Sequence, residues 1–197
     1  MPDLSSPPVS VALVGMPGSG KSALGRRLAQ RLGWPFVDLD QVIEERAGCT
    51  IRELFEREGE AHFRDMEQRV IAEFSRGAVA SVIATGGGAV LRPENRDMLR
   101  SGPRVIYLWS SPEALYRRLR HDVKRPLLQV ADPLARLRSL YDARDPLYRE
   151  VAGSVVDTGH ASVTVLTRAL YELLVELGVV AAGAPPSAET PPQAARG

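Results

Sequence analysis

Gly15-Met16-Pro17-Gly18-Ser19-Gly20-Lys21-Ser22 is the stretch of this sequence that decides the fold. It fits the phosphate-binding P-loop pattern, in which four residues separate two glycines and the second glycine is followed by Lys and then Ser or Thr. Glycines lack the Cβ atoms that would keep backbone N–H groups away from phosphate oxygens. Lys21 brings a cation to the β- and γ-phosphates, and the Ser22 hydroxyl suits the Mg²⁺ that bridges them. We therefore expect the loop and the following helix start, Gly18, Ser19, Gly20, Lys21, Ser22 and Ala23, to bind a nucleotide.

The segments around this loop predict an alternating α/β chain. Residues 9–14 form a short apolar run that predicts a buried strand, and residues 23–32 predict a helix. Further strands are expected at 35–40, 79–84, 104–109 and 154–157. Helices are expected from the Thr50–Glu53 capping box to Gly59, at 61–76 and 93–100, after Ser111-Pro112, at 133–148 with an interruption near Asp145-Pro146, and after Ser162. This order predicts a five-stranded parallel sheet with helices on both faces.

The composition is that of an ordinary globular protein. The 197 residues carry a net charge of +1, which gives no reason to expect binding to nucleic acid or membrane. The single cysteine, Cys49, excludes an internal disulfide and a cysteine metal cluster. There is no apolar run of membrane length, and residues 1–8 lack the apolar core of a signal peptide. We expect a cytoplasmic, monomeric enzyme.

Two further groups of residues fall where predicted strands end. Asp38 and Asp40 close the second predicted strand, and Thr85-Gly86-Gly87-Gly88 follows the third. Ligands of open α/β sheets bind at the carboxyl ends of the strands. One of the two carboxylates is suited to hold Mg²⁺ through water, and the other to accept a proton from an attacking hydroxyl.

Three arginines are candidates for binding anionic groups. Arg64 follows the apolar Phe63 and lies three residues before Glu67, with which it can pair. Arg125 precedes a proline in a polar segment that is a candidate lid, and Arg144 precedes Asp145-Pro146. From spacing alone, each of them is equally compatible with a solvated surface arginine.

Taken together, the motifs resemble the shikimate kinase family over roughly residues 9–177. The matching segments are the P-loop, Asp38-Leu39-Asp40, Phe63-Arg64 with Glu67, Gly86-Gly87-Gly88, Arg125-Pro126-Leu127-Leu128, and Arg144 with Pro146-Leu147-Tyr148. The resemblance implies a nucleoside-monophosphate-kinase-like fold with a lid. It also implies transfer of the γ-phosphoryl group of ATP to the 3-hydroxyl of shikimate, on the pathway to chorismate and the aromatic amino acids.

The same resemblance implies a role for each matching residue. Asp40 would hold the substrate hydroxyls and act as base. Arg64 and Arg144 would bind the shikimate carboxylate. The glycine loop Gly86, Gly87 and Gly88 would line the substrate, with the Gly87 N–H nearest to it.

On the nucleotide side, the resemblance implies that Arg118 stacks on adenine. Arg125 would contact the ATP phosphates and the transferred group, so that it joins Lys21 and Asp40 in catalysis. Asp38 would hold Mg²⁺ through water. One departure from the family pattern follows Val156-Asp157-Thr158, where Gly159 to Ser162 contain neither arginine nor proline, so adenine contacts there would rest on backbone groups.

Two alternatives remain open at this point. A gluconate-type sugar-acid kinase shares the fold and an acidic, hydroxylated acceptor, but the Asp38, Asp40, Arg64 and Arg144 set favours shikimate. A regulatory ligand-binding module on the same fold would carry a DNA-binding segment before the kinase-like part, and about eight residues precede the first strand here.

The domain organisation expected from the sequence is a single kinase domain over residues 9–178. Its substrate-binding region would span about 38–65 and its lid about 118–130. Residues 1–8 and 179–197 are rich in Pro, Ala and polar residues, and we expect both to be disordered.

The P-loop assignment predicts that Lys21→Ala abolishes turnover, because the cation beside the transferred phosphate is lost. The far-ultraviolet circular dichroism spectrum should remain that of the parent protein. Turnover above about a tenth of the parent rate would remove Lys21 from the catalytic residues.

Overall fold

The computed structural model describes residues 9–120 and 130–181, and within them one parallel sheet organises the chain. Its strands are β1 (Val11–Val14), β2 (Phe36–Asp38), β3 (Val82–Ala84), β4 (Arg104–Trp109) and β5 (Ser154–Asp157). They lie in the order β2-β3-β1-β4-β5, and every neighbouring pair is parallel. The predicted five-stranded parallel sheet is confirmed.

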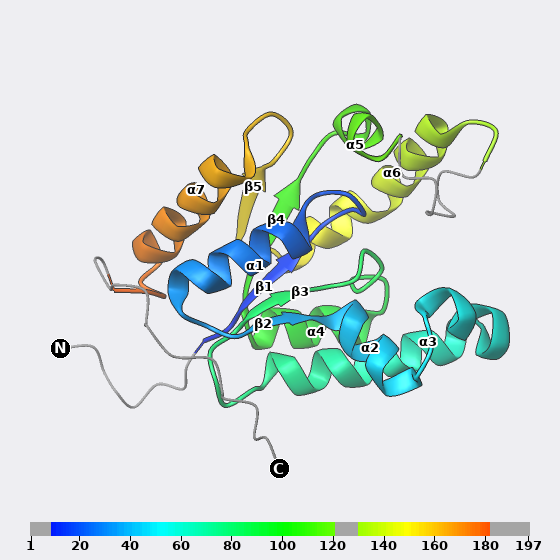
Figure 1. Cartoon of the computed structure of the whole chain (residues 1–197), viewed down its shortest axis with the longest axis horizontal. Helices are drawn as coiled ribbons and strands as arrows, with labels where there is room; N and C mark the ends of the chain where they lie inside the picture. Colours follow the sequence, from blue (N-terminus) through cyan, green and yellow to red (C-terminus); the bar gives the residue numbers. More distant parts are fainter. Residues whose placement is uncertain (1–8, 121–129, 182–197) are drawn as a thin grey trace, which may run out of the picture.

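Helices cover both faces of this sheet, as predicted (Figure 1). The helices are α1 (Lys21–Leu32), α2 (Leu39–Ala47), α3 (Ile51–Ser75), α4 (Pro93–Ser101), α5 (Pro112–Leu119), α6 (Pro133–Val151) and α7 (Val163–Glu176). The helices α1 and α7 lie side by side on one face (Figure 1). The other helices pack toward the opposite face, so the architecture has three layers, α/β/α.

Alternation along β1 divides the core into two parts. Val11 and Leu13 pack with residues of α1 and α7, whereas Ala12 and Val14 pack with residues of α2 to α6. All four side chains have no exposed surface. A central parallel strand is buried on both faces, which explains why this segment reads as a continuous apolar run.

The strands are shorter than predicted at 9–14, 35–40 and 79–84. Val82 pairs with both Val11 and Phe36, so ladder pairing on the three strands begins at one common level. Val79 is 65% exposed and takes no part in the ladder. Apolar runs extend beyond the residues that find a partner, and this accounts for the overlong predictions.

The carboxyl end of β2 differs most from the prediction. Asp38 ends the strand and caps α2, since its side chain accepts a hydrogen bond from the Asp40 N–H. Asp40 therefore lies in the first turn of a helix that the sequence reading missed, and the two acids do not share a strand end. Aspartate at an N-cap satisfies a helix N–H group that would otherwise lack a partner.

The long helices follow the prediction in one case and depart from it in another. The Thr50–Glu53 capping box starts α3, and Gly59 breaks its helical geometry with φ 82° and ψ 170°, as predicted. In contrast, α6 continues through Pro146, where an interruption was expected. Proline removes one backbone hydrogen bond, and the buried Leu137 and Tyr148 on either side hold the helix in the core.

Some expectations lie outside the described residues. They concern the termini, residues 1–8 and 182–197, and residues 121–129, which include Arg125 and most of the expected lid. Within residues 9–120 and 130–181, every helix is too short or too polar to cross a membrane.

The core between α1 and α7 predicts the effect of Leu170→Ala. Leu170 has no exposed surface, so truncation should lower the free energy of unfolding by about 3 kcal/mol in urea titrations. Val165→Ala on the same helix is the control, because Val165 is 58% exposed and its truncation should change stability by less than about 0.5 kcal/mol. Equal losses in both variants would contradict this description of the core.

Candidate active site

The P-loop joins β1 to α1 through backbone conformations that require glycine. Gly15 has φ 149° and Gly18 has φ 84°. A Cβ on Gly15 would lie 2.7 Å from the Leu108 carbonyl oxygen, and one on Gly18 would lie 2.8 Å from the Leu119 side chain. The loop is thus packed closely against β4 and α5, and glycine is the residue that fits at both positions.

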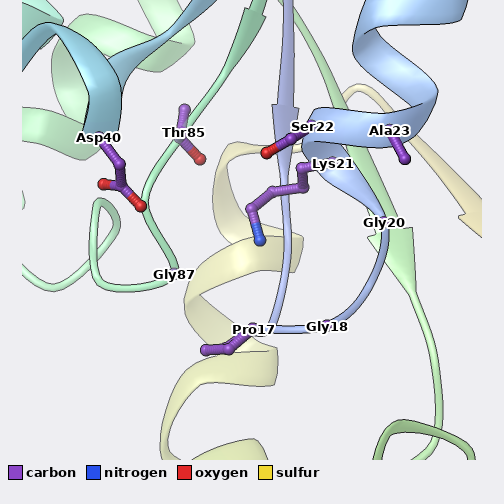
Figure 2. Close-up of a pocket in the computed structure, with 9 residues that line it drawn as sticks. All are labelled: Pro17, Gly18, Gly20, Lys21, Ser22, Ala23, Asp40, Thr85 and Gly87. Carbon is purple, nitrogen blue, oxygen red and sulfur yellow. The ribbon is translucent and has the colours of Figure 1, made fainter. Parts of the chain in front are cut away.

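The side chain of Lys21 is held over the P-loop by backbone carbonyl groups of the loop. Its ammonium nitrogen, Nζ, donates to the Gly15 oxygen at 2.8 Å and to the Met16 oxygen at 3.0 Å. The residue is only 9% exposed, and its Nζ points toward the space between the P-loop and Gly87 (Figure 2). A cation held in this way is already in place for an anionic ligand at the start of α1.

Ser22 and Asp38 connect the start of α1 to the start of α2. The Ser22 hydroxyl donates to Asp38 Oδ2 at 2.7 Å, while Asp38 Oδ1 accepts from the Asp40 N–H at 3.2 Å. The structure therefore brings together a hydroxyl and a carboxylate that lie sixteen residues apart in the chain. The parallel order of β1, β3 and β2 causes this, because the loops after these strands open at one edge of the sheet.

Asp40 lies in a largely buried, charged environment. Burial is the main cause that raises the pKa of its carboxyl above the ordinary value, and the nearby Asp38 and Glu44 raise it further. Lys21 and Arg64 act in the opposite direction. The carboxyl group is thus made more basic than an exposed aspartate, which suits a group that receives a proton.

Arg64 and Glu67 form a partly buried ion pair on α3. Arg64 Nη1 donates to Glu67 Oε2 at 2.6 Å, as the spacing predicted, and its Nη2 donates to the exposed Glu60 at 3.1 Å. Glu67 is 1% exposed, and burial raises the pKa of its carboxyl against the opposing effect of Arg64. Its Oε1 has no hydrogen-bond partner among the described residues.

The glycine loop after β3 lies between these charged side chains. A Cβ on Gly86 would lie 2.7 Å from Asp40 Oδ1 and 3.0 Å from Glu67 Oε1. A Cβ on Gly88 would overlap the Arg64 guanidinium group. Side chains of α2 and α3 thus occupy the space beside Gly86 and Gly88, and Pro17 of the P-loop lies 2.9 Å from where a Cβ on Gly87 would be.

Arg144 and Tyr148 reach the same loop from α6. Arg144 Nη1 donates to the Gly87 carbonyl oxygen at 3.2 Å, and the Tyr148 hydroxyl donates to the same oxygen at 2.5 Å. Arg64 and Arg144, eighty positions apart, thus approach one loop from two helices. The sequence reading quoted Tyr148 only as part of a motif, and its aromatic ring gave no signal of this contact.

Arg118 lies on α5, away from the glycine loop. Its guanidinium group donates to the backbone oxygen and to the hydroxyl of Thr158, in the loop after β5. The Trp109 carbonyl oxygen accepts the Thr158 N–H at 2.8 Å, so the ends of β4 and β5 are joined at this point. Arg118 therefore borders the loop for which the sequence predicted nucleotide contacts.

One cleft of about 400 Å³ joins the P-loop to Asp40 and the glycine loop (Figure 2). Its lining residues are Pro17, Gly18, Gly20, Lys21, Ser22, Ala23, Asp40, Thr85 and Gly87. The sequence analysis had placed Pro17 in the P-loop and Thr85 at the ligand edge of the sheet, without naming either as a binding residue. Within the described parts of the chain, no group of three or more His, Cys, Asp and Glu residues is placed to hold a metal. The cleft combines a cation and N–H donors on one side with a carboxylate on the other, an arrangement suited to phosphoryl transfer to a hydroxyl.

Comparison with known proteins agrees with this geometry. The family described as shikimate kinase matches residues 17–174. The shikimate kinase of Paracidovorax citrulli is 56% identical over 154 residues, which are 78% of this chain and 84% of the relative. Among solved structures, a shikimate kinase from Acinetobacter baumannii in complex with shikimate has a TM-score of 0.79 at 40% identity, covering 88% of this chain and 95% of its own. A gluconokinase from Sinorhizobium meliloti has a TM-score of 0.52 at 20% identity, covering 86% of this chain and 93% of its own, a likeness that shows the fold alone.

Proposed function

The chain belongs to the shikimate kinase family, and from this premise we propose how its residues transfer the γ-phosphoryl group of ATP to the 3-hydroxyl of shikimate. Membership makes it an enzyme of the pathway to chorismate and the aromatic amino acids. The observation that carries the proposal is that Lys21 and Asp40 line one cleft (Figure 2). The phosphate-binding cation and the acceptor-side carboxylate thus face a shared volume in which transfer can occur.

The P-loop forms the nucleotide side of this cleft. Its backbone N–H groups and the start of α1 would bind the β- and γ-phosphates, with Lys21 between them. On phosphate binding, the Lys21 ammonium would exchange part of its bonding to the Gly15 and Met16 oxygens for the stronger bond to an anion. Arg118 would border the adenine, and Arg125, outside the described residues, would approach the transferred group.

The residues at the start of α1 and α2 fit a magnesium ion. Ser22 lines the cleft and its hydroxyl donates to Asp38 Oδ2, so a hydroxyl and a carboxylate oxygen lie together there, and these are ligands that Mg²⁺ takes together with water. Ser22 would bind the ion directly and Asp38 through water. When bound, Mg²⁺ neutralises charge that develops on the phosphates during transfer.

On the acceptor side, cationic side chains would bind the carboxylate of shikimate, and an anionic side chain would face its 3-hydroxyl. Arg64 and Arg144 would share its carboxylate, which suits the planar guanidinium group, while the N–H groups of the glycine loop add neutral donors. Asp40 would accept the proton of the 3-hydroxyl as that oxygen attacks the γ-phosphorus. Its raised pKa makes it a better acceptor for this proton than an exposed aspartate.

The surroundings of the enzyme are part of the same proposal. The enzyme would work as a cytoplasmic monomer, and its near-neutral net charge gives no reason to expect nucleic-acid or membrane partners. The single domain would span residues 9–178, with the substrate-binding region at about 38–65 and the lid at about 118–130.

The carboxylate assignment predicts a selective effect of Arg64→Ala. The KM for shikimate should rise tenfold or more, on the order expected for a lost charge-assisted hydrogen bond, while the KM for ATP stays within about twofold. Arg57→Ala is the matched control, because Arg57 lies on the same helix with 65% of its side chain exposed. A parallel rise of both KM values would show that Arg64 does not serve the acceptor specifically.

The variant Asp40→Asn should have a lower kcat and a higher thermal stability at pH 7 than the parent protein. Because the pKa of Asp40 is raised in the folded state, the protonated carboxyl stabilises the fold relative to the ionised one. This stabilisation is lost as the pH rises through the folded-state pKa, so the ionised group destabilises the fold at neutral pH. The neutral variant should therefore have a higher melting temperature at pH 7, a difference that disappears near the ordinary pKa of 3.8. Its kcat should fall about a hundredfold or more.

The exposed Asp142 offers the control for this experiment, since Asp142→Asn should leave both kcat and the melting temperature at pH 7 close to those of the parent protein. An unchanged kcat in Asp40→Asn would remove Asp40 as the base. A lower melting temperature at pH 7 would contradict the described electrostatics.

A further inference from the structure

The hydroxyl of Tyr148 is held in a fixed position inside the protein. Tyr148 has no exposed surface, and its ring packs against Tyr107 with ring centroids 5.0 Å apart. The hydroxyl donates to the Gly87 oxygen at 2.5 Å and lies 4.0 Å from the Met16 sulfur. Burial raises the pKa of the phenol to about 12, so the group keeps its proton and remains a donor.

The carbonyl groups of the glycine loop are each held by a donor. The Gly86 oxygen accepts from the Ala89 N–H at 3.2 Å, and the Gly88 oxygen accepts from the Leu91 N–H at 3.0 Å. These two bonds stay within the loop. The Gly87 oxygen instead accepts two side-chain donors from α6, Arg144 and Tyr148, which lie one helical turn apart.

Fixing this carbonyl also fixes an N–H group. The peptide unit between Gly87 and Gly88 is planar and trans, so its C=O and N–H point in opposite directions. With the oxygen bound to α6, the Gly88 N–H points away from α6. Among the described residues this N–H has no backbone hydrogen-bond acceptor, and it stays available as a donor.

We propose that Tyr148 is a positioning residue for the acceptor, which holds the Gly87–Gly88 peptide in place when Arg144 turns from the Gly87 oxygen to the acceptor carboxylate. The inference rests on the proposed function, in which Arg144 binds that carboxylate. A carbonyl that is left without a donor inside a protein costs free energy. Because Tyr148 keeps its bond to Gly87, Arg144 can leave that oxygen without this cost.

Removal of the hydroxyl should therefore weaken acceptor binding specifically. In Tyr148→Phe, Arg144 is the one remaining donor to the Gly87 oxygen in the described contacts, so recruiting it to the acceptor leaves the carbonyl bare. The P-loop is held separately by the bonds of Lys21 to Gly15 and Met16, and the distant contact with the Met16 sulfur adds little. ATP binding should be unaffected.

The experiment compares Tyr148→Phe with Tyr107→Phe in the full-length protein. Tyr107 is the matched control because it is equally buried and packs on the same ring, yet its hydroxyl donates to Asp145 at 2.9 Å, away from the glycine loop. For both variants, the melting temperature, kcat and both KM values are measured, and the Kd for shikimate is determined by calorimetry without ATP.

We expect Tyr148→Phe to raise the KM and Kd for shikimate about tenfold, with the KM for ATP within about twofold and kcat within about threefold. Tyr107→Phe should lower the melting temperature without changing any of these constants. The inference is overturned if shikimate binding in Tyr148→Phe stays within about twofold, if both KM values rise together, or if Tyr107→Phe gives the same pattern.

Arg64→Ala measured in the same series separates this inference from the proposed function. If Arg64→Ala raises the KM for shikimate and Tyr148→Phe does not, the acceptor site stands and only the role of Tyr148 fails. If neither variant affects shikimate, the acceptor site itself is misplaced and both proposals fail together.

Discussion

The rest of the site depends on the hydrogen bonds that join the carboxyl ends of β1 and β3. The Leu13 carbonyl oxygen accepts both the backbone N–H of Thr85, at 3.2 Å, and its hydroxyl, at 3.1 Å. Directly after this joint the two chains diverge into the P-loop and the glycine loop. Because Asp38 and Leu13 both pair with Ala84 of β3, Asp38 lies at the same level of the sheet, and Asp40 follows it in the first turn of α2. A backbone pairing between apolar strands thus sets the distance between the nucleotide and acceptor sides of the cleft.

Charges around the cleft are balanced in a way that is unfavourable for stability and favourable for binding. The half-buried Asp40 and the buried Glu67 are carboxyl groups with raised pKa values; Arg64 opposes the shift at both, and Lys21 opposes it at Asp40. Each cation is held by protein groups that an anionic ligand can replace. Lys21 rests on loop carbonyls, and Arg64 rests on Glu67 and the exposed Glu60. A protein that maximised stability would not bury these groups together, so their arrangement is that of a binding site prepared for charged ligands.

The sequence allowed prediction of those features that depend on local chemistry. The P-loop glycines, the Thr50–Glu53 capping box and the break at Gly59 depend on contacts within a few residues, and all three are confirmed. The predicted position of Asp40 at a strand end was wrong. Asp38, which precedes an apolar residue, suits a strand end and a helix cap equally well, and here it caps the helix that carries Asp40. Whether Pro146 ends a helix depends on how firmly the core holds both sides of it, and spacing does not contain that information.

The roles of Arg64, Arg144 and Tyr148 show a second limit. Spacing predicted the pair that Arg64 forms with Glu67 on the same helix, but a lone arginine or tyrosine has no sequence signal that names a distant partner. For Arg144 and Tyr148 that partner is the Gly87 backbone oxygen, on another segment. The sequence singled out the two arginines as candidates and family resemblance supplied their role, whereas the contact of Tyr148 became visible only in the fold. Loop contacts of this kind are set by how α6 and α3 pack, so they become visible with the tertiary structure.

The central claim is that this cleft phosphorylates shikimate, and it is tested most directly by ADP release. The protein is incubated with ATP and Mg²⁺, and shikimate, quinate and gluconate are added separately. The account predicts a strong increase in ADP release with shikimate and little with the other two acids. An equal or greater response to gluconate, or no response to any acceptor in protein that binds ATP, would contradict it.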